Sequence, residues 1–215
     1  MKILVAIDSF KGTMKSSDIS ELVKKHYQRK LNHDFSLLPI SDGGEGFLNA
    51  IESMKDIMKV DIEVEGPMGQ PKKSYYLMKD KTAFIELANS SGLSLLKESQ
   101  RNPLQTSTYG LGQTIKKVLY EDIEHLVIGI GGSSTNDGGT GMLKALGLKF
   151  FDENNNEIDR MTGASIQRIK SIDMNNLDPR ANEIKVSLAC DVTNPLIGQN
   201  GATHTYGKQK GADEQ

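Results

Sequence analysis

The order of apolar and polar positions predicts two strand–helix units at the start of the chain. Residues 3–7 form a continuous apolar run with β-branched side chains, which is typical of a strand buried on both faces. Apolar side chains then recur at helical spacing over residues 17–27, which predicts an amphipathic helix. A second strand over residues 35–40 and a second amphipathic helix over residues 47–54 repeat this order. Strand, helix, strand, helix is the pattern of a parallel α/β sheet.

The spacing of apolar residues along the chain changes after the second helix. Residues 60–64 alternate between apolar and polar side chains, as the residues of a half-exposed strand do. A turn at residues 66–69 separates this strand from two closely spaced strand-like segments, residues 73–78 and 83–87, which predict a meander. We place a domain boundary near Glu65, because the spacing of apolar residues and the order of predicted elements change there.

The second half of the chain alternates helices and strands again. A helix is predicted over residues 108–120, and an apolar strand over residues 125–130 leads into a glycine-rich segment, residues 131–141. Another apolar strand, residues 184–190, ends directly before Asp191.

Composition narrows the class of protein. The 215 residues suggest one large domain or two small ones. The formal net charge is −2, which gives no basic surface for nucleic acid. Cys190 is the single cysteine, so an intrachain disulfide is excluded. The first apolar run stops at Asp8, which is too short for a signal peptide, and no run approaches the ~20 residues that span a bilayer. We therefore expect a cytoplasmic protein with no nucleic-acid or membrane partner.

A loop pattern occurs twice. Residues 42–51 and 137–146 align without gaps and carry the same residue at six of ten positions, and each segment follows a predicted strand and opens a predicted helix. A glycine inside a helix costs ~1 kcal/mol relative to alanine, so several glycines at a helix entrance favour a function. Unpaired N–H groups at such an entrance bind anions. The alternative is that Asp-Gly forms an ordinary turn and the glycines only allow close packing.

Four predicted strands end in loops that carry an aspartate: Asp8, Asp42, Asp137 and Asp191. Ligands of open α/β sheets bind outside the carboxyl ends of the strands, so these carboxylates are expected to share one cleft. Like charges so close together favour a cation, and Mg²⁺ with substrate phosphates suits such a site. Backbone donors, a cation and a base are what phosphoryl transfer requires, and Lys11 could meet a phosphate or a carboxylate. The alternatives are capping or turn formation for each aspartate, and a solvated surface charge for Lys11.

These loops resemble the signature segments of bacterial type I glycerate kinases. The resemblance is carried, in chain order, by residues 8–12, 39–46, 131–139 and 190–195, with residues 102–110 in addition. It implies a flavodoxin-like parallel-sheet domain interrupted by a second α/β domain. We accordingly expect residues 1–65 to be the first part of the flavodoxin-like domain and residues 66–215 the second domain. Relatives continue past the equivalent of Gln215, so we expect the chain to be truncated.

The resemblance also implies an activity, the transfer of the ATP γ-phosphoryl group to D-glycerate, with ATP and Mg²⁺ required. The 2- and the 3-hydroxyl of glycerate both remain possible acceptors, and the oligomeric state is open. One alternative is a non-catalytic fragment that binds a small anion or nucleotide, and another is a Mg²⁺-dependent phosphatase.

Chemistry and resemblance together give a set of candidate site residues. The predicted catalytic residues are Asp8, Lys11, Asp42, Asp137 and Asp191, of which Asp42 and Asp191 are also predicted to hold the metal ion. The predicted substrate- or nucleotide-binding residues are Gly43, Gly44, Gly132, Ser133, Ser134, Thr135, Asn136, Gly138, Gly139 and Asn194.

Overall fold

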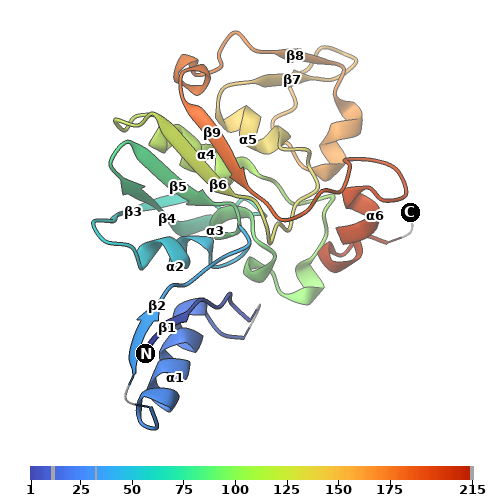
Figure 1. Ribbon diagram of the computed structural model, residues 1–215. Coiled ribbons are helices and arrows are strands. Elements are labelled where there is room, and N and C mark those ends of the chain that lie inside the picture. The colour runs from blue at the N-terminus through green and yellow to red at the C-terminus, as the bar shows by residue number, and fades with distance from the viewer. Residues whose placement is uncertain (11–12, 32, 214–215) are drawn as a thin grey trace.

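The computed structural model describes residues 1–10, 13–31 and 33–213. In these ranges the chain has the expected α/β architecture, with a five-stranded sheet and two two-stranded sheets (Figure 1). The strands are β1 (Lys2–Val5), β2 (Asp34–Leu37), β3 (Met58–Glu65), β4 (Pro71–Lys79), β5 (Thr82–Glu86), β6 (His125–Gly129), β7 (Lys149–Phe151), β8 (Ser171–Asp173) and β9 (Lys185–Ala189). The α-helices are α1 (Ser16–Gln28), α2 (Phe47–Glu52), α3 (Ala88–Ser91), α4 (Tyr109–Val118), α5 (Thr140–Ala145) and α6 (Ala202–Tyr206). No helix in the described ranges is long and apolar enough to cross a membrane.

The five-stranded sheet has the order β3-β4-β5-β6-β9. β4 is antiparallel to both β3 and β5, as the predicted meander requires. β6 is parallel to both β5 and β9, in a register that pairs Gly129 with Glu86 on one side and with Ala189 on the other. The carboxyl ends of the three parallel strands therefore lie at the same level.

Helices cover both faces of this sheet. Ile85 of β5 belongs to an apolar core that includes Ile115 of α4. The preceding residue, Phe84, packs against a second core that includes Leu48 of α2. Successive residues of a strand point to opposite faces, so α4 and α2 lie on opposite faces of the sheet. Both helices are thereby fixed relative to the strand ends.

The first strand–helix–strand unit differs in one respect from its prediction. β1 and β2 are parallel, and α1 connects them and packs against them (Figure 1). Val5 is buried, but Leu4 is 63% exposed. The prediction of a strand buried on both faces is therefore wrong for this chain, because no element in the described part of the chain covers the face that carries Leu4.

The expected domain boundary falls at the end of β3. This strand ends at Glu65 and pairs with β4 along its whole length, from Met58–Met78 to Glu65–Pro71. Strands on the two sides of the boundary thus share one sheet. The division into residues 1–65 and 66–215 stays a prediction.

Candidate functional site

The Asp42 loop crosses the ends of two parallel strands. The Gly131 N–H, just beyond β6, donates a hydrogen bond of 3.0 Å to the Gly43 carbonyl. A Cβ atom on Gly43 would lie 2.2 Å from the Ala189 carbonyl oxygen at the end of β9, and Gly43 has a φ of +87°. Only glycine accepts both the close approach and the left-handed backbone. The predicted glycine of this loop therefore serves to bring the loop against the strand ends.

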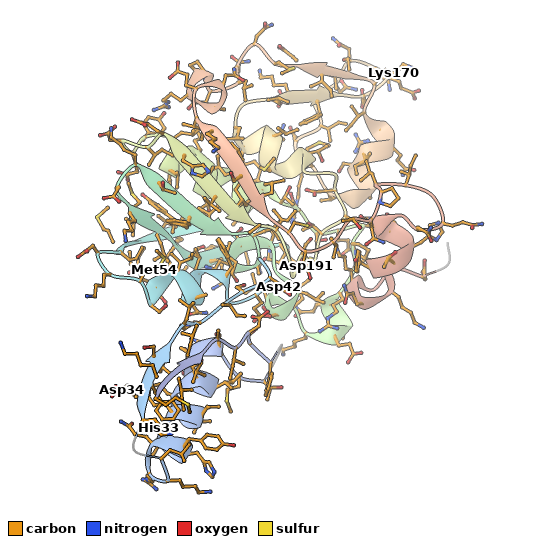
Figure 2. The ribbon with its side chains drawn as sticks, viewed as in Figure 1. His33, Asp34, Asp42, Met54, Lys170 and Asp191 are labelled. Atoms are coloured by element: carbon orange, nitrogen blue, oxygen red, sulfur yellow. The ribbon has the colours of Figure 1, made fainter. Side chains whose placement is uncertain are left out.

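This crossing brings the loops of Asp42 and Asp191 together. Figure 2 shows both side chains at the same end of the sheet. Asp42 is half-buried, and its Oδ1 accepts a hydrogen bond of 2.8 Å from the Gly44 N–H. Asp191 lies two residues beyond β9 and is exposed.

The described residues, with 11–12, 32 and 214–215 left aside, contain no group of three carboxylate, histidine or cysteine side chains that could hold a metal ion. Mg²⁺ is commonly bound by one or two carboxylates together with substrate phosphates and water. Two aspartates on meeting loops fit a metal ion that arrives with its nucleotide. The metal site at Asp42 and Asp191 stays a prediction.

The first loop lies beside the Asp42 loop. Asp8 Oδ1 accepts a hydrogen bond of 2.6 Å from the Ser9 N–H, and Ser9 Oγ donates a long one of 3.5 Å to the Glu45 carbonyl. Ser9, which follows Asp8 in the sequence, thus links the first loop to the Asp42 loop. Lys11, the fifth predicted catalytic residue, lies outside the described residues.

Asp137 is only 1% exposed and has its carboxylate bonded within the protein. Its Oδ2 accepts hydrogen bonds from the Thr108 N–H and hydroxyl, both 2.8 Å, and from the Gly141 N–H at 3.2 Å. Its Oδ1 accepts from the Gly139 N–H at 3.2 Å. A carboxylate accepts about four hydrogen bonds, so these four occupy the Asp137 side chain. Their donors lie at the starts of α4 and α5, which Asp137 therefore joins. A catalytic role for Asp137 stays a prediction.

Sequence reasoning missed Glu86, which ends β5 and is 5% exposed. Its two carboxylate oxygens accept hydrogen bonds from the Gly46 N–H at 3.1 Å and from the Leu48 N–H at 2.9 Å. Burial raises the pKa of Glu86, while these backbone N–H groups partly oppose that shift. The available signal was a carboxylate inside an apolar strand, since such a group is almost never buried without partners.

The two repeated loops therefore do not offer unpaired helix N–H groups at these positions, as the repeat suggested. At α2, the Gly46 and Leu48 N–H groups bind Glu86. At α5, the Gly141 N–H binds Asp137, and the Met142 N–H binds the Thr108 hydroxyl at 2.9 Å. The favourable interaction of a helix N-terminus with an anion is satisfied by the protein's own carboxylates.

The glycine-rich segment after β6 has several left-handed residues. Gly132, Gly138 and Gly139 have φ values of +71°, +58° and +74°. Ser134 is 1% exposed, and both its N–H and its hydroxyl donate hydrogen bonds of 2.9 Å to the Ser91 carbonyl. Ser134 therefore anchors the segment to α3, and its predicted role in ligand binding stays a prediction.

Two predicted asparagines contact the C-terminal segment. Asn136 Nδ2 donates a hydrogen bond of 3.0 Å to the Thr203 hydroxyl of α6. Asn194 Oδ1 accepts one of 2.8 Å from the Tyr206 hydroxyl, at the end of the same helix. Both side chains thus lie against α6, and Asn136 links this helix to the glycine-rich segment.

Lys210 is a second residue that sequence reasoning missed. Its Nζ donates hydrogen bonds of 2.8 Å to the Thr135 carbonyl and 3.4 Å to the Ser133 hydroxyl. Ser133 and Thr135 are themselves linked, with 2.9 Å between their hydroxyl oxygens. The signal was weak, because Lys210 stands 75 residues from Thr135 in the sequence.

The Asp42 loop, the glycine-rich segment and the Asp191 loop thus meet at the ends of the parallel strands, and the described part of the first loop lies beside the Asp42 loop. Comparison with known proteins shows which family has this arrangement. The chain matches the sequence profile of the glycerate kinase family over residues 3–215. The chain belongs to the glycerate kinase family. This confirms the resemblance drawn from the motifs.

Several members of the glycerate kinase family match this chain along its length. A glycerate kinase of Halalkalibacterium halodurans is 42% identical over 214 residues, which cover 98% of this chain and 56% of that protein. The glycerate 2-kinase of Escherichia coli is 41% identical and covers 100% of this chain, with 57% of its own length matched. A crystal structure assigned as glycerate kinase 2 of Salmonella typhimurium LT2 is 39% identical, with a TM-score of 0.85 over 100% of this chain and 58% of that one. The chain therefore spans little more than half the length of the relatives it matches.

Proposed function

We propose that the full-length protein is an ATP-dependent glycerate kinase, which transfers the γ-phosphoryl group to D-glycerate. The observation that carries this proposal is the crossing of the Asp42 loop over the ends of β6 and β9, next to Asp191. It gathers the family's motifs at the edge where open α/β sheets bind their ligands. Because residues 3–215 match the glycerate kinase family, we infer that the reaction at this edge of the sheet is phosphoryl transfer to glycerate.

We further propose that the 2-hydroxyl of glycerate is the acceptor and that the product is 2-phosphoglycerate. The support is the relative of Escherichia coli, whose name is glycerate 2-kinase and which is 41% identical to this chain. We also place the reaction in the cytoplasm, the compartment that supplies ATP.

The residues of the site can be given roles on chemical grounds. Asp42 and Asp191 would hold Mg²⁺, which neutralises the charge of the nucleotide phosphates during phosphoryl transfer. Asp8 would accept the proton of the attacking hydroxyl. As the new bond from that oxygen to the γ-phosphorus forms, the bond to the bridging oxygen breaks and ADP leaves. Lys11 would pair with a phosphate or with the substrate carboxylate.

The test is ADP release by the full-length protein with D-glycerate and MgATP, with each component omitted in turn. Release that requires D-glycerate, ATP and Mg²⁺ supports the proposal, and ³¹P NMR of the product separates 2- from 3-phosphoglycerate. No ADP release above the control without glycerate would refute it. Nucleotide binding without turnover would instead support a binding module, and phosphate release from phosphoglycerate without nucleotide would indicate a phosphatase.

A further inference from the structure

The backbone between Asp42 and α2 contains three glycines, Gly43, Gly44 and Gly46. Because glycine has the widest choice of backbone conformations, this loop does not hold its shape by itself. The N-cap residue of α2 is Gly46, with a φ of +93°, and it has no side chain that could accept from the first N–H groups of the helix. The shape of the loop must therefore come from contacts with the strands beneath it.

The loop is fixed at the carboxyl ends of three neighbouring strands. At Gly43, the contacts are made by the backbone just beyond β6 and at the end of β9. At the other end of the loop, the side chain of Glu86, which ends β5, accepts hydrogen bonds from the Gly46 N–H at 3.1 Å and from the Leu48 N–H at 2.9 Å. Glu86 therefore ties the α2 end of the loop to the sheet.

The carboxylate of Glu86 can hold this end of the loop in a way that a neutral side chain cannot. Glu86 is 5% exposed, and burying a carboxylate is unfavourable unless protein partners replace its water. Its two oxygens, Oε1 and Oε2, each accept from a different backbone N–H group. An amide of the same size has one acceptor oxygen in place of two. The carboxylate thus fixes both N–H groups, and with them the position of the start of α2.

We propose that Glu86 is a positioning residue for Asp42: it holds the α2 end of the loop so that the Asp42 carboxylate lies beside the loop of Asp191. Glu86 acts through the backbone, since its oxygens contact the N–H groups at the start of α2. Asp42 stands at the other end of the same loop, four residues before Gly46. This inference rests on the proposed function, in which Asp42 holds Mg²⁺.

Three variants of the full-length protein test the proposal. Glu86→Gln keeps the size of the side chain and removes one acceptor oxygen. Glu86→Asp keeps the carboxylate on a side chain that is one methylene shorter. Tyr76→Phe is the matched control, because Tyr76 is 2% exposed and its hydroxyl donates a hydrogen bond of 2.7 Å to Glu121. Glu121 lies between α4 and β6, at the amino end of the parallel strands, so the control loses a hydrogen bond of a buried residue away from the site.

The first measurement is amide hydrogen exchange in peptides that cover residues 42–48, under conditions in which each variant is folded. Glu86→Gln is expected to raise the exchange rate of these peptides by ~10-fold, because it removes a hydrogen bond to a charged group. Glu86→Asp should raise it less, and Tyr76→Phe should leave it at the wild-type value. Wild-type exchange of these peptides in Glu86→Gln would overturn the proposal.

The second measurement is steady-state kinetics, with kcat, the KM for D-glycerate and the Mg²⁺ concentration that gives half of the maximal rate. Glu86→Gln should lower kcat by ~10-fold and raise the half-saturating Mg²⁺ concentration by ~3-fold or more, with the KM for D-glycerate changed less than ~2-fold. Glu86→Asp should lose less than Glu86→Gln, and Tyr76→Phe should match the wild type.

Three kinetic results would contradict the role of Glu86. They are wild-type kcat and Mg²⁺ dependence in a folded Glu86→Gln protein, an equal loss in Tyr76→Phe, and turnover lost in either Glu86 variant without faster exchange at residues 42–48. The wild type separates this inference from the proposed function. A wild-type protein without glycerate-dependent turnover would refute the proposed function and the inference with it, whereas an active wild type with a fully active Glu86→Gln variant would refute the inference alone.

Discussion

The two loops that share a sequence pattern, residues 42–47 and 137–142, use it in different ways. Both begin with the same turn, in which the aspartate Oδ1 accepts from the N–H two residues later: 2.8 Å for Asp42 and Gly44, 3.2 Å for Asp137 and Gly139. Beyond the turn the backbones diverge. α2 starts at Phe47, whereas α5 starts at Thr140, two positions earlier in the aligned pattern.

The difference lies in which carboxylate holds the helix. The start of α5 is bonded to the aspartate of its own loop, and Asp137 is buried in consequence. The start of α2 is bonded to Glu86, which comes from β5. Asp42 is therefore not required to hold its helix, and it lies half-buried beside the loop of Asp191. A repeated motif can thus mark a structural carboxylate in one copy and a carboxylate suited to a ligand in the other.

The largest difference in stability between the two loops is expected when the second residue of each loop, Gly43 or Gly138, is replaced by alanine. Gly43→Ala would put a Cβ atom 2.2 Å from the Ala189 carbonyl oxygen at a φ of +87°. Strain and overpacking together should cost ~3 kcal/mol or more and displace the Asp42 loop from the strand ends. Urea denaturation and turnover measure the two consequences.

The matched variant is Gly138→Ala in the other loop. Its φ is +58°, and the nearest atom to an added Cβ is Ile166 Cδ1 at 3.9 Å, so only the left-handed backbone is unfavourable. The expected cost is ~1 kcal/mol. Equal losses of stability in the two variants would contradict the close packing of the Asp42 loop on β9.

A smaller effect is expected at Glu86. Glu86→Gln leaves one of the Gly46 and Leu48 N–H groups without its acceptor, which should cost ~1–3 kcal/mol at neutral pH. Because burial raises the folded-state pKa of Glu86 above 4.5, the folded state holds a proton more tightly than the unfolded chain. Glu86 therefore makes stability fall as the pH rises from about 4.5 to the raised pKa. Urea denaturation across that pH range should show this fall in the wild type and lack it in Glu86→Gln.

The control for Glu86 is Glu45→Gln. Glu45 is exposed, and its negative charge contributes to the raised pKa of Glu86. Its loss should change stability by less than ~0.5 kcal/mol and keep most of the pH dependence, because burial is the larger cause of the raised pKa of Glu86. A pH dependence that survives unchanged in Glu86→Gln would show that another group causes it.

Much of the fold was predictable from the sequence, because apolar periodicity is local. The helix expected over residues 108–120 is α4 at Tyr109–Val118, and the strand expected over residues 125–130 is β6 at His125–Gly129. The exposed face of β1 was not predictable, since the burial of a strand face depends on whether another element packs against it.

The site was predictable only as far as its loops. The meeting of the Asp42 and Asp191 loops follows from the rule that parallel strands present their carboxyl ends at one edge. The partners that distinguish the loops are distant in sequence: Glu86 stands 40 residues from Gly46, and Thr108 stands 29 residues from Asp137. Nothing in the ten-residue repeat indicates which distant partner each copy has.

The most direct test compares Asp42→Asn with Asp137→Asn in the full-length protein, by turnover with D-glycerate and MgATP and by urea denaturation. We expect Asp42→Asn to lower kcat by ~100-fold or more, equivalent to about 2.7 kcal/mol, and to change the free energy of unfolding by less than ~0.5 kcal/mol. Asp137→Asn should instead lose ~2–4 kcal/mol of stability, because the NH2 group that replaces one carboxylate oxygen cannot accept the hydrogen bonds made there, and the remaining neutral oxygen accepts more weakly. Full turnover in Asp42→Asn, or a stable Asp137→Asn protein, would contradict the division of roles between the two loops.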